Sequence, residues 1–312
     1  MATHLETRTD AVLITGPTAS GKSALALDIA RRHDGVVINA DSMQVYDVLR
    51  VLSARPSADE MAGVPHHLYG HVDPRRPYST GDWLREIEAL LQGLRADGRL
   101  PVIVGGTGLY FRALTGGLSA MPPVPAEIRT HWRNRLAQEG PEALHAVLAA
   151  EDPATAARLG IQDGQRIVRA LEMFAATGQA IGAFHTGTGP MIVDPDRARK
   201  YIVLPDRAVL AERINRRFAG MLDDGAVEEV ERLLSLDVAP EMPVMKAIGV
   251  SQIAAMLKGE MTRQQVIEKA AAATRQYAKR QMTWFRNQMD DTWHRMDPTG
   301  PERAAAVDQS LS

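Results

Sequence analysis

The sequence contains no cysteine, which excludes disulfide bonds, cysteine-ligated zinc and catalysis by a thiol. It also lacks long apolar runs. Its longest apolar stretches are far too short to cross a bilayer, so we expect no membrane association. The first ten residues lack the apolar core of a signal peptide, so we expect no export. These absences together predict a cytoplasmic protein.

A strong net charge is absent as well, because 36 basic and 38 acidic residues leave a formal charge of −2. No global field therefore draws the chain toward nucleic acid. The charge is uneven, however. Residues 197–217 contain seven bases against two acids, and residues 275–286 contain four bases and no acid. Such local stripes suit a phosphate-bearing partner, with solvated helix faces as the alternative.

A phosphate-binding motif lies near the N-terminus, where Gly16, Gly21, Lys22 and Ser23 fit the pattern G-x-x-x-x-G-K-[ST]. A short apolar run precedes it and a stretch of helix-forming residues follows, which predicts a strand, a glycine loop and a helix. The glycines let backbone N–H groups converge, and the helix N-terminus adds positive potential. The lysine supplies a movable cation, and the Ser23 hydroxyl is a candidate Mg²⁺ ligand.

The fold expected for these 312 residues is a parallel α/β sheet of the P-loop NTPase type, flanked by helices. Three further apolar runs predict strands, and helical stretches separate them. The expected strands are 36–39, 102–105 and 201–204, and the expected helices include 80–96 and 207–234. In such a sheet the ligand is expected at the carboxyl ends of the strands.

A helical insertion is expected to interrupt this sheet at residues 122–184, after a proline-rich hinge. Three helical segments are predicted there, at 126–138, 141–150 and 165–177. The catalytic core then consists of residues 1–121 and 185–297. The segment 298–312 is expected to be a loose tail. Near residue 262, Thr262 and Gln265 form a capping box that predicts the start of the last long helix, ending near residue 288.

Asp41 follows the second expected strand and therefore lies at the carboxyl edge of the sheet, beside the phosphate loop. Three roles are open to its carboxylate. It could position Mg²⁺, it could act as a base toward an attacking nucleophile, or it could cap the following helix. Its location favours a catalytic role.

Thr107 lies among three glycines after the third expected strand, where backbone and hydroxyl can closely approach a ligand. Its hydroxyl is a candidate hydrogen-bond donor to a phosphate oxygen, and a tight turn is the alternative. This strand does not end in an acid, as the Mg²⁺-supporting strand of many triphosphatases does. The absence weakens an assignment as an ATPase.

Eight ordered motifs between about residues 11 and 290 resemble those of bacterial tRNA dimethylallyltransferases. They are GPTASGKS, NADSMQVY, PHHL, VGGTGLYFRAL, DGQRIVRALE, RINRRFAGMLDDGAVEEV, KAIG and AKRQMTWFRNQ. The resemblance implies transfer of a dimethylallyl group from its diphosphate to the 6-amino nitrogen of the adenosine just 3′ of the anticodon. It also implies that the loop holds the diphosphate of an isoprenoid and not ATP.

The resemblance further implies roles for individual residues. Asp41 would be the base toward the adenine amine, with Thr107 and Lys22 as the other catalytic residues, and Ser23 would ligate Mg²⁺. The diphosphate would be bound by Gly16, Pro17, Thr18, Ala19, Ser20, Gly21, Lys22, Ser23, Arg213 and Arg217.

The partner implied is the anticodon stem-loop of tRNA, bound by a monomer. Its contacts would be Asp41, Ser42, Met43, Gln44, Thr107, Arg129, Gln165, Arg166, Ile167, Val168, Arg169, Lys246, Lys279, Arg280, Gln281 and Arg286.

Three alternatives share parts of this pattern. An adenine-nucleotide isopentenyltransferase would use the same core but needs no anticodon-binding insertion. A small-molecule kinase shares the loop but leaves the insertion and the basic C-terminal helix unexplained. A non-enzymatic RNA-binding protein with a relic loop is disfavoured by the intact set of Lys22, Ser23, Asp41 and Thr107.

Overall fold

The computed structural model describes residues 9–119, 121–184 and 189–298. A six-stranded sheet with parallel pairings runs through it in the order β3-β2-β4-β1-β5-β6. The strands are β1 (Ala11–Thr15), β2 (Val36–Asn39), β3 (His66–His67), β4 (Pro101–Gly105), β5 (Ala198–Val203) and β6 (His294–Met296). The expected parallel α/β fold is thus confirmed.

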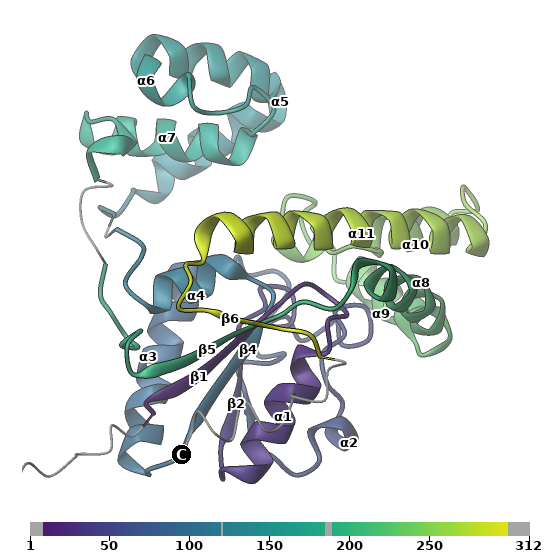
Figure 1. The fold of residues 1–312 in the computed structure, drawn as a ribbon. Helices are drawn as coiled ribbons and strands as arrows, with labels where there is room; N and C mark the ends of the chain where they lie inside the picture. Colours follow the sequence, from purple (N-terminus) through teal and green to yellow (C-terminus); the bar gives the residue numbers. More distant parts are fainter. Residues whose placement is uncertain (1–8, 120, 185–188, 299–312) are drawn as a thin grey trace, which may run out of the picture. The chain divides into compact units, whose positions relative to one another are not determined.

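Side chains of the central strands alternate between the two faces of the sheet, and both faces are buried. Leu13 belongs to the cluster that contains helices α3 (Thr80–Ala96) and α4 (Gly108–Leu114). Val12 belongs to the opposite cluster, with helix α1 (Lys22–Arg32). Figure 1 shows this three-layer arrangement. It explains why the strands read as continuous apolar runs and not as alternating ones.

The two edge strands were not expected from the sequence. Strand β3 has two residues and β6 has three, and both contain histidine. A hydrophobic pattern of that length cannot be distinguished from a loop. Both strands pair through backbone hydrogen bonds, β3 with β2 and β6 with β5.

The helical stretch expected at 207–234 is two helices, so that expectation was wrong in its continuity. Helix α8 (Arg207–Asp223) ends before Gly225, whose φ of 106° is in the left-handed region, and α9 (Ala226–Ser235) begins after it. Glycine adopts this conformation without the steric cost borne by other residues. Three short helices complete the unit that contains the sheet. They are α2 (Ala58–Met61), the 3-10 helix η2 (Pro243–Lys246) and α10 (Val250–Leu257).

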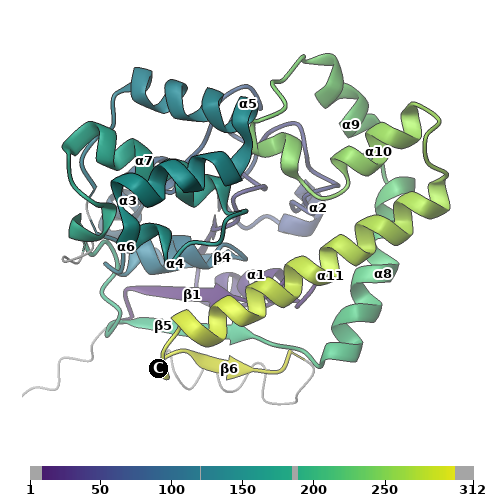
Figure 2. The ribbon, with the colours of Figure 1, turned by 90° about the horizontal axis from the view of Figure 1, so that it is seen from above.

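The last long helix, α11 (Arg263–Gln288), begins as predicted. The Thr262 side chain accepts a hydrogen bond from the Gln265 N–H, and the Gln265 side chain accepts one from the Thr262 N–H. Helix α11 packs beside α8 through Leu210, Ile214 and Ala278, as seen from above in Figure 2. One face of this helix is thereby buried along the seam with α8.

The described chain divides into two compact units, and Gly116–Met191 forms the second. It contains α5 (Ala126–Glu151), α6 (Pro153–Ala156), α7 (Gly164–Thr177) and the 3-10 turn η1 (Ile181–Phe184). Helix α5 is broken at Gly140, where φ is 80° and ψ is 170°, so its halves match the two segments expected there. The unit has a hydrophobic cluster of its own. Most of the expected tail, from residue 299 onward, lies outside the described residues.

Candidate active site

The phosphate loop joins β1 to α1 and has the conformation that its glycines permit. A Cβ atom at Gly16 would lie 2.5 Å from the Val203 carbonyl oxygen, so no larger residue fits there. Gly21 has a φ of 91°, and α1 begins directly after it with no side-chain cap and no acid in its first turn. The first N–H groups of α1 therefore lack intrahelical partners and can bind an anion.

A buried hydroxyl also marks this loop. Ser20 is fully buried, and its Oγ has no hydrogen-bond partner in the described part of the chain. Buried polar atoms are normally paired, so this hydroxyl is an exception. It faces Gly16 of the same loop, where a Cβ atom would lie 2.9 Å from it, and the anion donors of the loop are therefore its backbone N–H groups and Lys22.

Lys22 carries the charge of the loop. Its Nζ donates a hydrogen bond to the Pro17 carbonyl oxygen at 3.2 Å. Desolvation by the surrounding protein lowers the pKa of Lys22 to about 8, Asp41 opposes this effect, and Arg217 adds to it. The carboxylate of Asp41 and the guanidinium of Arg217 therefore act on the same ammonium. A bound diphosphate would stabilise the protonated form.

Asp41 lies after β2, and its two carboxylate oxygens have different surroundings. Oδ1 accepts a hydrogen bond from the Met43 N–H at 2.9 Å. Oδ2 faces Gly106, where a Cβ atom would lie 3.3 Å away. The segment after Asp41 is a turn and not a helix, so helix capping does not explain this residue. Of the two oxygens, Oδ1 is thus engaged by the backbone of its own loop, and Oδ2 is directed toward the loop after β4.

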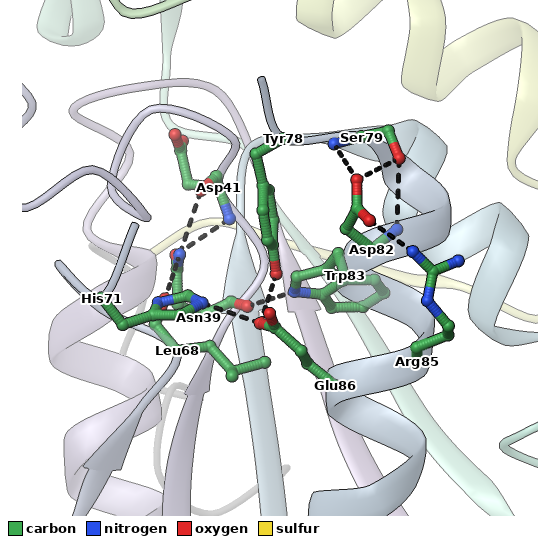
Figure 3. Close-up of polar contacts among 10 residues, drawn as sticks. All are labelled: Asn39, Asp41, Leu68, His71, Tyr78, Ser79, Asp82, Trp83, Arg85 and Glu86. Atoms are coloured by element: carbon green, nitrogen blue, oxygen red, sulfur yellow. Dashed lines mark hydrogen bonds and ion pairs between the residues drawn. The ribbon is translucent and has the colours of Figure 1, made fainter. Parts of the chain in front are cut away.

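Asn39, which the sequence analysis missed, fixes the backbone of Asp41. Its Oδ1 accepts from the Asp41 N–H at 2.9 Å, and its Nδ2 donates to the carbonyl oxygens of Asp41 and Leu68. In Figure 3 the carboxylate of Asp41 points away from this amide. A polar residue ending a fully buried strand was the signal that could have identified it.

A second network in Figure 3 supports the same region from α3. The Tyr78 hydroxyl donates to Glu86 at 2.6 Å, and His71 Nε2 bonds to the same carboxylate oxygen at 2.7 Å. Burial, together with the hydrogen bond to Glu86, raises the pKa of Tyr78. Trp83 of the same helix donates its indole N–H to the Asn39 carbonyl oxygen at 2.8 Å. These contacts hold the end of β2 against α3.

Thr107 lies in the loop after β4 and is bonded to Ser42, the residue that follows Asp41. Its Oγ1 accepts a hydrogen bond from the Ser42 N–H at 3.0 Å and donates to Ser42 Oγ at 3.3 Å. Its backbone N–H donates to the Ala40 carbonyl oxygen at 3.2 Å. The loops after β2 and β4 are thereby joined through Thr107, which places its hydroxyl beside the candidate base.

Two arginines of α8 lie near the phosphate loop. A Cβ atom at Gly21 would lie 3.9 Å from Arg213 Nη1. Arg217 interacts electrostatically with Asp41 and with Glu60 of α2. Both arginines predicted to bind diphosphate are therefore near the loop, one turn apart on the same helix face.

Three tyrosines near Asp41 were not predicted. Burial raises the pKa of Tyr69, Tyr110 and Tyr277, and the negative charge of Asp41 raises each further. They come from the loop after β3, from α4 and from α11, so no sequence spacing connects them. Apolar ring surface around a carboxylate suits a site that must exclude water.

The loop after Asp41 contains three of the predicted RNA contacts, and its side chains are partly engaged by the protein. Gln44 Nε2 donates to the carbonyl oxygens of Ser53 and Ala54, each at 3.0 Å. Met43 packs against the cluster that contains α9 and α10. Ser42 is held by Thr107 as described. Gln44 therefore shapes the loop through its amide nitrogen.

In the helical unit the predicted RNA contacts divide into two groups. Ile167 and Val168 are buried in the hydrophobic cluster of that unit, so their side chains do not face RNA as the sequence suggested. Arg129, Gln165 and Arg166 are exposed. Arg169 is partly exposed. Its Nη1 forms an ion pair with Oε2 of the buried Glu172 at 3.4 Å.

The predicted contacts on α11 also divide by burial. Gln281 is buried, with both amide atoms bonded to loops of the site. Lys279, Arg280 and Arg286 are exposed, as is Lys246 in η2. A groove of about 360 Å³ runs along α8 and α11, and its ten lining residues include four cations and no carboxylate: Arg207, Arg275, Lys279 and Arg286. A phosphate backbone complements such a surface.

The residues present fit Mg²⁺ only as an ion shared with a substrate. Among the described residues no three histidines or acids are grouped to hold a metal. The Ser23 hydroxyl is exposed in the first turn of α1, beside the anion-binding N–H groups. Mg²⁺ commonly binds through one or two protein oxygens together with phosphate oxygens and water. The donor set matches that arrangement.

No helix within the described ranges is long and apolar enough to span a membrane.

The sheet order, the glycine loop before α1 and the acid after β2 define a P-loop α/β protein with a group-transfer site. Comparison with known proteins narrows this class. A family model described as IPP transferase matches residues 44–288, and one described as isopentenyl transferase matches residues 9–70. The chain therefore belongs to the IPP transferase family, and it is a prenyltransferase enzyme of the tRNA dimethylallyltransferase type.

Close relatives carry that name. The tRNA dimethylallyltransferase of Allorhizobium ampelinum is 66% identical over 298 residues, covering 96% of this chain and 98% of the relative. The tRNA dimethylallyltransferase of Rhizobium johnstonii is 67% identical over 293 residues, which cover 94% of this chain and 99% of the relative. At this identity and coverage the kinase and adenine-nucleotide alternatives are not favoured.

Solved structures agree. The tRNA isopentenylpyrophosphate transferase of Bacillus halodurans has a TM-score of 0.68 and 32% identity, covering 97% of both chains. A eukaryotic dimethylallyltransferase described as acting on tRNA has a TM-score of 0.79 and 25% identity, covering 96% of this chain and 77% of the other.

Proposed function

We propose that this enzyme transfers the dimethylallyl group of dimethylallyl diphosphate to the 6-amino nitrogen of the adenosine immediately 3′ of the anticodon in tRNA. One observation carries this proposal. Gln281 joins Thr18 of the phosphate loop to Gly106, and a Cβ atom at Gly106 would lie 3.3 Å from Asp41 Oδ2, so the phosphate loop and the candidate base share one site.

The leaving group is the first requirement of the reaction. The bond between the allylic carbon and the diphosphate oxygen breaks, and negative charge grows on the diphosphate. Lys22, Arg213, Arg217 and the N–H groups at the start of α1 are proposed to stabilise that charge, and their position at or near the phosphate loop supports this role. The Ser23 hydroxyl would help to hold Mg²⁺, and the ion would supply further positive charge to the leaving group.

The nucleophile is the second requirement. The adenine amine is weakly nucleophilic because its lone pair is shared with the ring, so removal of its proton assists attack. As the new nitrogen–carbon bond forms, the proton passes to Asp41 Oδ2. Oδ1 stays bonded to the Met43 N–H and keeps the carboxylate oriented. Thr107, bonded to Ser42, lies beside the reacting groups.

Binding of tRNA is the third requirement. The target base must leave its stack to reach a carboxylate at the sheet edge. The exposed cations Lys246, Lys279, Arg280 and Arg286 in the catalytic unit, and Arg129 and Arg166 in the helical unit, are proposed to contact the RNA backbone, together with the partly buried Arg169. We propose that the enzyme acts as a cytoplasmic monomer.

The test is to incubate the protein with Mg²⁺, dimethylallyl diphosphate labelled in the allyl group, and unmodified tRNA with adjacent adenosines in its anticodon loop. Label in the tRNA, mapped to the adenosine 3′ of the anticodon, supports the proposal. Label on free AMP and none on tRNA would assign the enzyme to adenine nucleotides. A parallel tRNA with guanosine at that position is the matched control and should remain unlabelled.

A further inference from the structure

Gln281 joins the two loops of the active site from outside the sheet. Its Oε1 accepts a hydrogen bond from the Thr18 N–H at 3.0 Å, and its Nε2 donates to the Gly106 carbonyl oxygen at 2.9 Å. Thr18 belongs to the phosphate loop after β1, and Gly106 belongs to the loop after β4. The side chain is only 7% exposed, so it makes these bonds inside the protein.

The link lies where the sheet itself no longer holds the loops together. The ladder between β1 and β4 ends with the pair Thr15 and Gly105, and the Thr15 hydroxyl adds one bond to the Gly105 carbonyl oxygen at 3.0 Å. Beyond that pair the chains turn into separate loops. Gln281 provides the next cross-link, between Thr18 and Gly106.

The contact also requires the glycine at position 106. A Cβ atom there would lie 2.4 Å from Gln281 Nε2 and 3.3 Å from Asp41 Oδ2. The amide of Gln281 and the Oδ2 atom of Asp41 thus approach the same small residue. Two residues further along, a Cβ atom at Gly108 would lie 2.2 Å from the ring of Trp284, which belongs to the same helix as Gln281.

We propose that Gln281 is a positioning residue that sets the separation between the diphosphate and the Asp41–Thr107 pair. The transfer needs the amine nitrogen in line with the allylic carbon and the leaving diphosphate oxygen, and also within reach of the base, so a small displacement of one loop is costly. The same side chain ties this separation to α11, whose exposed face carries Lys279 and Arg280. This inference rests on the proposed function of the site.

The hydrogen bond to Thr18 also decides what that residue does. Its backbone N–H donates to the Gln281 side chain, so this N–H holds the loop in position, and a contact of Thr18 with the diphosphate would have to come from its hydroxyl. The Ser20 N–H is bonded to the Pro17 carbonyl oxygen at 3.2 Å, so the N–H groups at the start of α1 are the main backbone donors for the anion.

The experiment compares Gln281→Met, which is close in size but loses both hydrogen bonds, with Gln276→Met on the exposed face of the same helix. Transfer is measured at saturating tRNA, and the affinity for tRNA is measured separately. We expect kcat to fall by about 100-fold in Gln281→Met, the scale of a misplacement of about 1 Å, while tRNA affinity is unchanged. Gln276→Met should match the wild type in both measurements.

Two outcomes would overturn the proposal. If tRNA affinity is about tenfold weaker and kcat is unchanged, Gln281 serves RNA binding. If the folded fraction retains wild-type kcat and KM, and only the melting temperature falls, the residue merely fills space. Failure of the functional proposal is distinct from both, because then the wild-type protein itself places no label on tRNA.

A double-mutant cycle at positions 106 and 281 still tests the proposal if Gln281→Met folds poorly. A Cβ atom at Gly106 would overlap the Gln281 amide at 2.4 Å and press only slightly on Asp41 Oδ2 at 3.3 Å, so most of the effect of Gly106→Ala on kcat and that of Gln281→Ala should arise from one broken contact. We expect the double variant Gly106→Ala/Gln281→Ala to lose about as much kcat as the more affected single variant. Independent losses that multiply would show that the two residues act separately and would contradict the proposal.

Discussion

The Asn39 side chain is hydrogen-bonded to both backbone polar groups of Asp41. Its Oδ1 accepts from the Asp41 N–H at 2.9 Å, and its Nδ2 donates to the Asp41 carbonyl oxygen at 3.0 Å. The amide is fully buried, so no solvent replaces these bonds. The position of the candidate base is therefore determined by a residue that does not touch the substrate. This arrangement leads to the first prediction.

Asn39→Asp should lower both stability and transfer. A carboxylate cannot donate to the carbonyl oxygens of Asp41 and Leu68, and those two acceptors would face negative charge. We expect the free energy of unfolding to fall by about 1–3 kcal/mol in urea titrations, and kcat to fall by up to about 100-fold. The exposed Asn134→Asp is the control and should leave both unchanged. Wild-type kcat in Asn39→Asp would refute the positioning role.

The pKa of Lys22 predicts a pH dependence of stability. Its folded-state value of about 8 lies below its ordinary value of 10.5, so between these values the unfolded chain binds more protons than the folded one. The stability of the wild type relative to Lys22→Met should therefore rise with pH from about 8 to 10.5. Urea unfolding of both proteins across this range measures the difference. A difference that falls with pH would contradict the assignment.

Substrate binding should show the opposite trend, because the diphosphate needs the charged form of Lys22. Affinity for dimethylallyl diphosphate should weaken as pH rises above about 8 in the wild type. Lys22→Met should bind weakly and lack this dependence, and titration calorimetry can compare the two. An equal decline in both proteins would locate the titrating group elsewhere.

Glu229 of α9 should control the loop after Asp41. The carboxylate is 3% exposed and accepts three backbone N–H bonds, from Arg50, Val51 and Leu52, at 2.8 to 3.1 Å. Glu229→Gln replaces one acceptor oxygen by a donor that faces an N–H group. We expect a loss of about 1–3 kcal/mol in unfolding free energy. The adjacent exposed Glu228→Gln is the matched control, and an equal effect of the two variants would disprove the prediction.

The cations beside α11 should act on RNA binding through charge. Removing two of them in Lys279→Gln/Arg286→Gln should weaken tRNA binding and reduce the slope of log Kd against log salt by about 0.7–0.9 for each phosphate that is no longer neutralised. Filter binding at several salt concentrations measures the slope. A salt slope identical to the wild type would show that α11 does not belong to the RNA interface.

Ile167→Ala should instead destabilise the helical unit, because that residue is fully buried.

Much of the site could be predicted from the sequence because its residues follow strands that form continuous apolar runs. The phosphate loop follows β1, Asp41 follows β2 and Thr107 follows β4, and parallel pairing brings these three positions together. The capping box at Thr262 could also be predicted, since it depends on two residues three positions apart. Local patterns and sheet topology were sufficient for these elements.

The rest depends on long-range packing that a single sequence does not display. Gln281 reaches the phosphate loop across 263 positions, and nothing in its neighbourhood distinguishes a buried amide from an RNA contact. Ile167 and Val168 lie within a motif shared with exposed arginines, so the motif alone did not separate core from surface. Asn39 resembled an ordinary strand end until its partners were known.

The central claim is that Asp41 accepts the proton of the amine at the site where the phosphate loop holds the diphosphate. The most direct measurement is single-turnover transfer of labelled dimethylallyl to tRNA by Asp41→Asn, with the exposed Asp47→Asn as control. The Asn side chain can still accept from the Met43 N–H, so the loop and tRNA affinity should persist. The account predicts a rate about 100- to 10,000-fold below wild type for Asp41→Asn and none of that loss for Asp47→Asn. A rate for Asp41→Asn equal to wild type would contradict it.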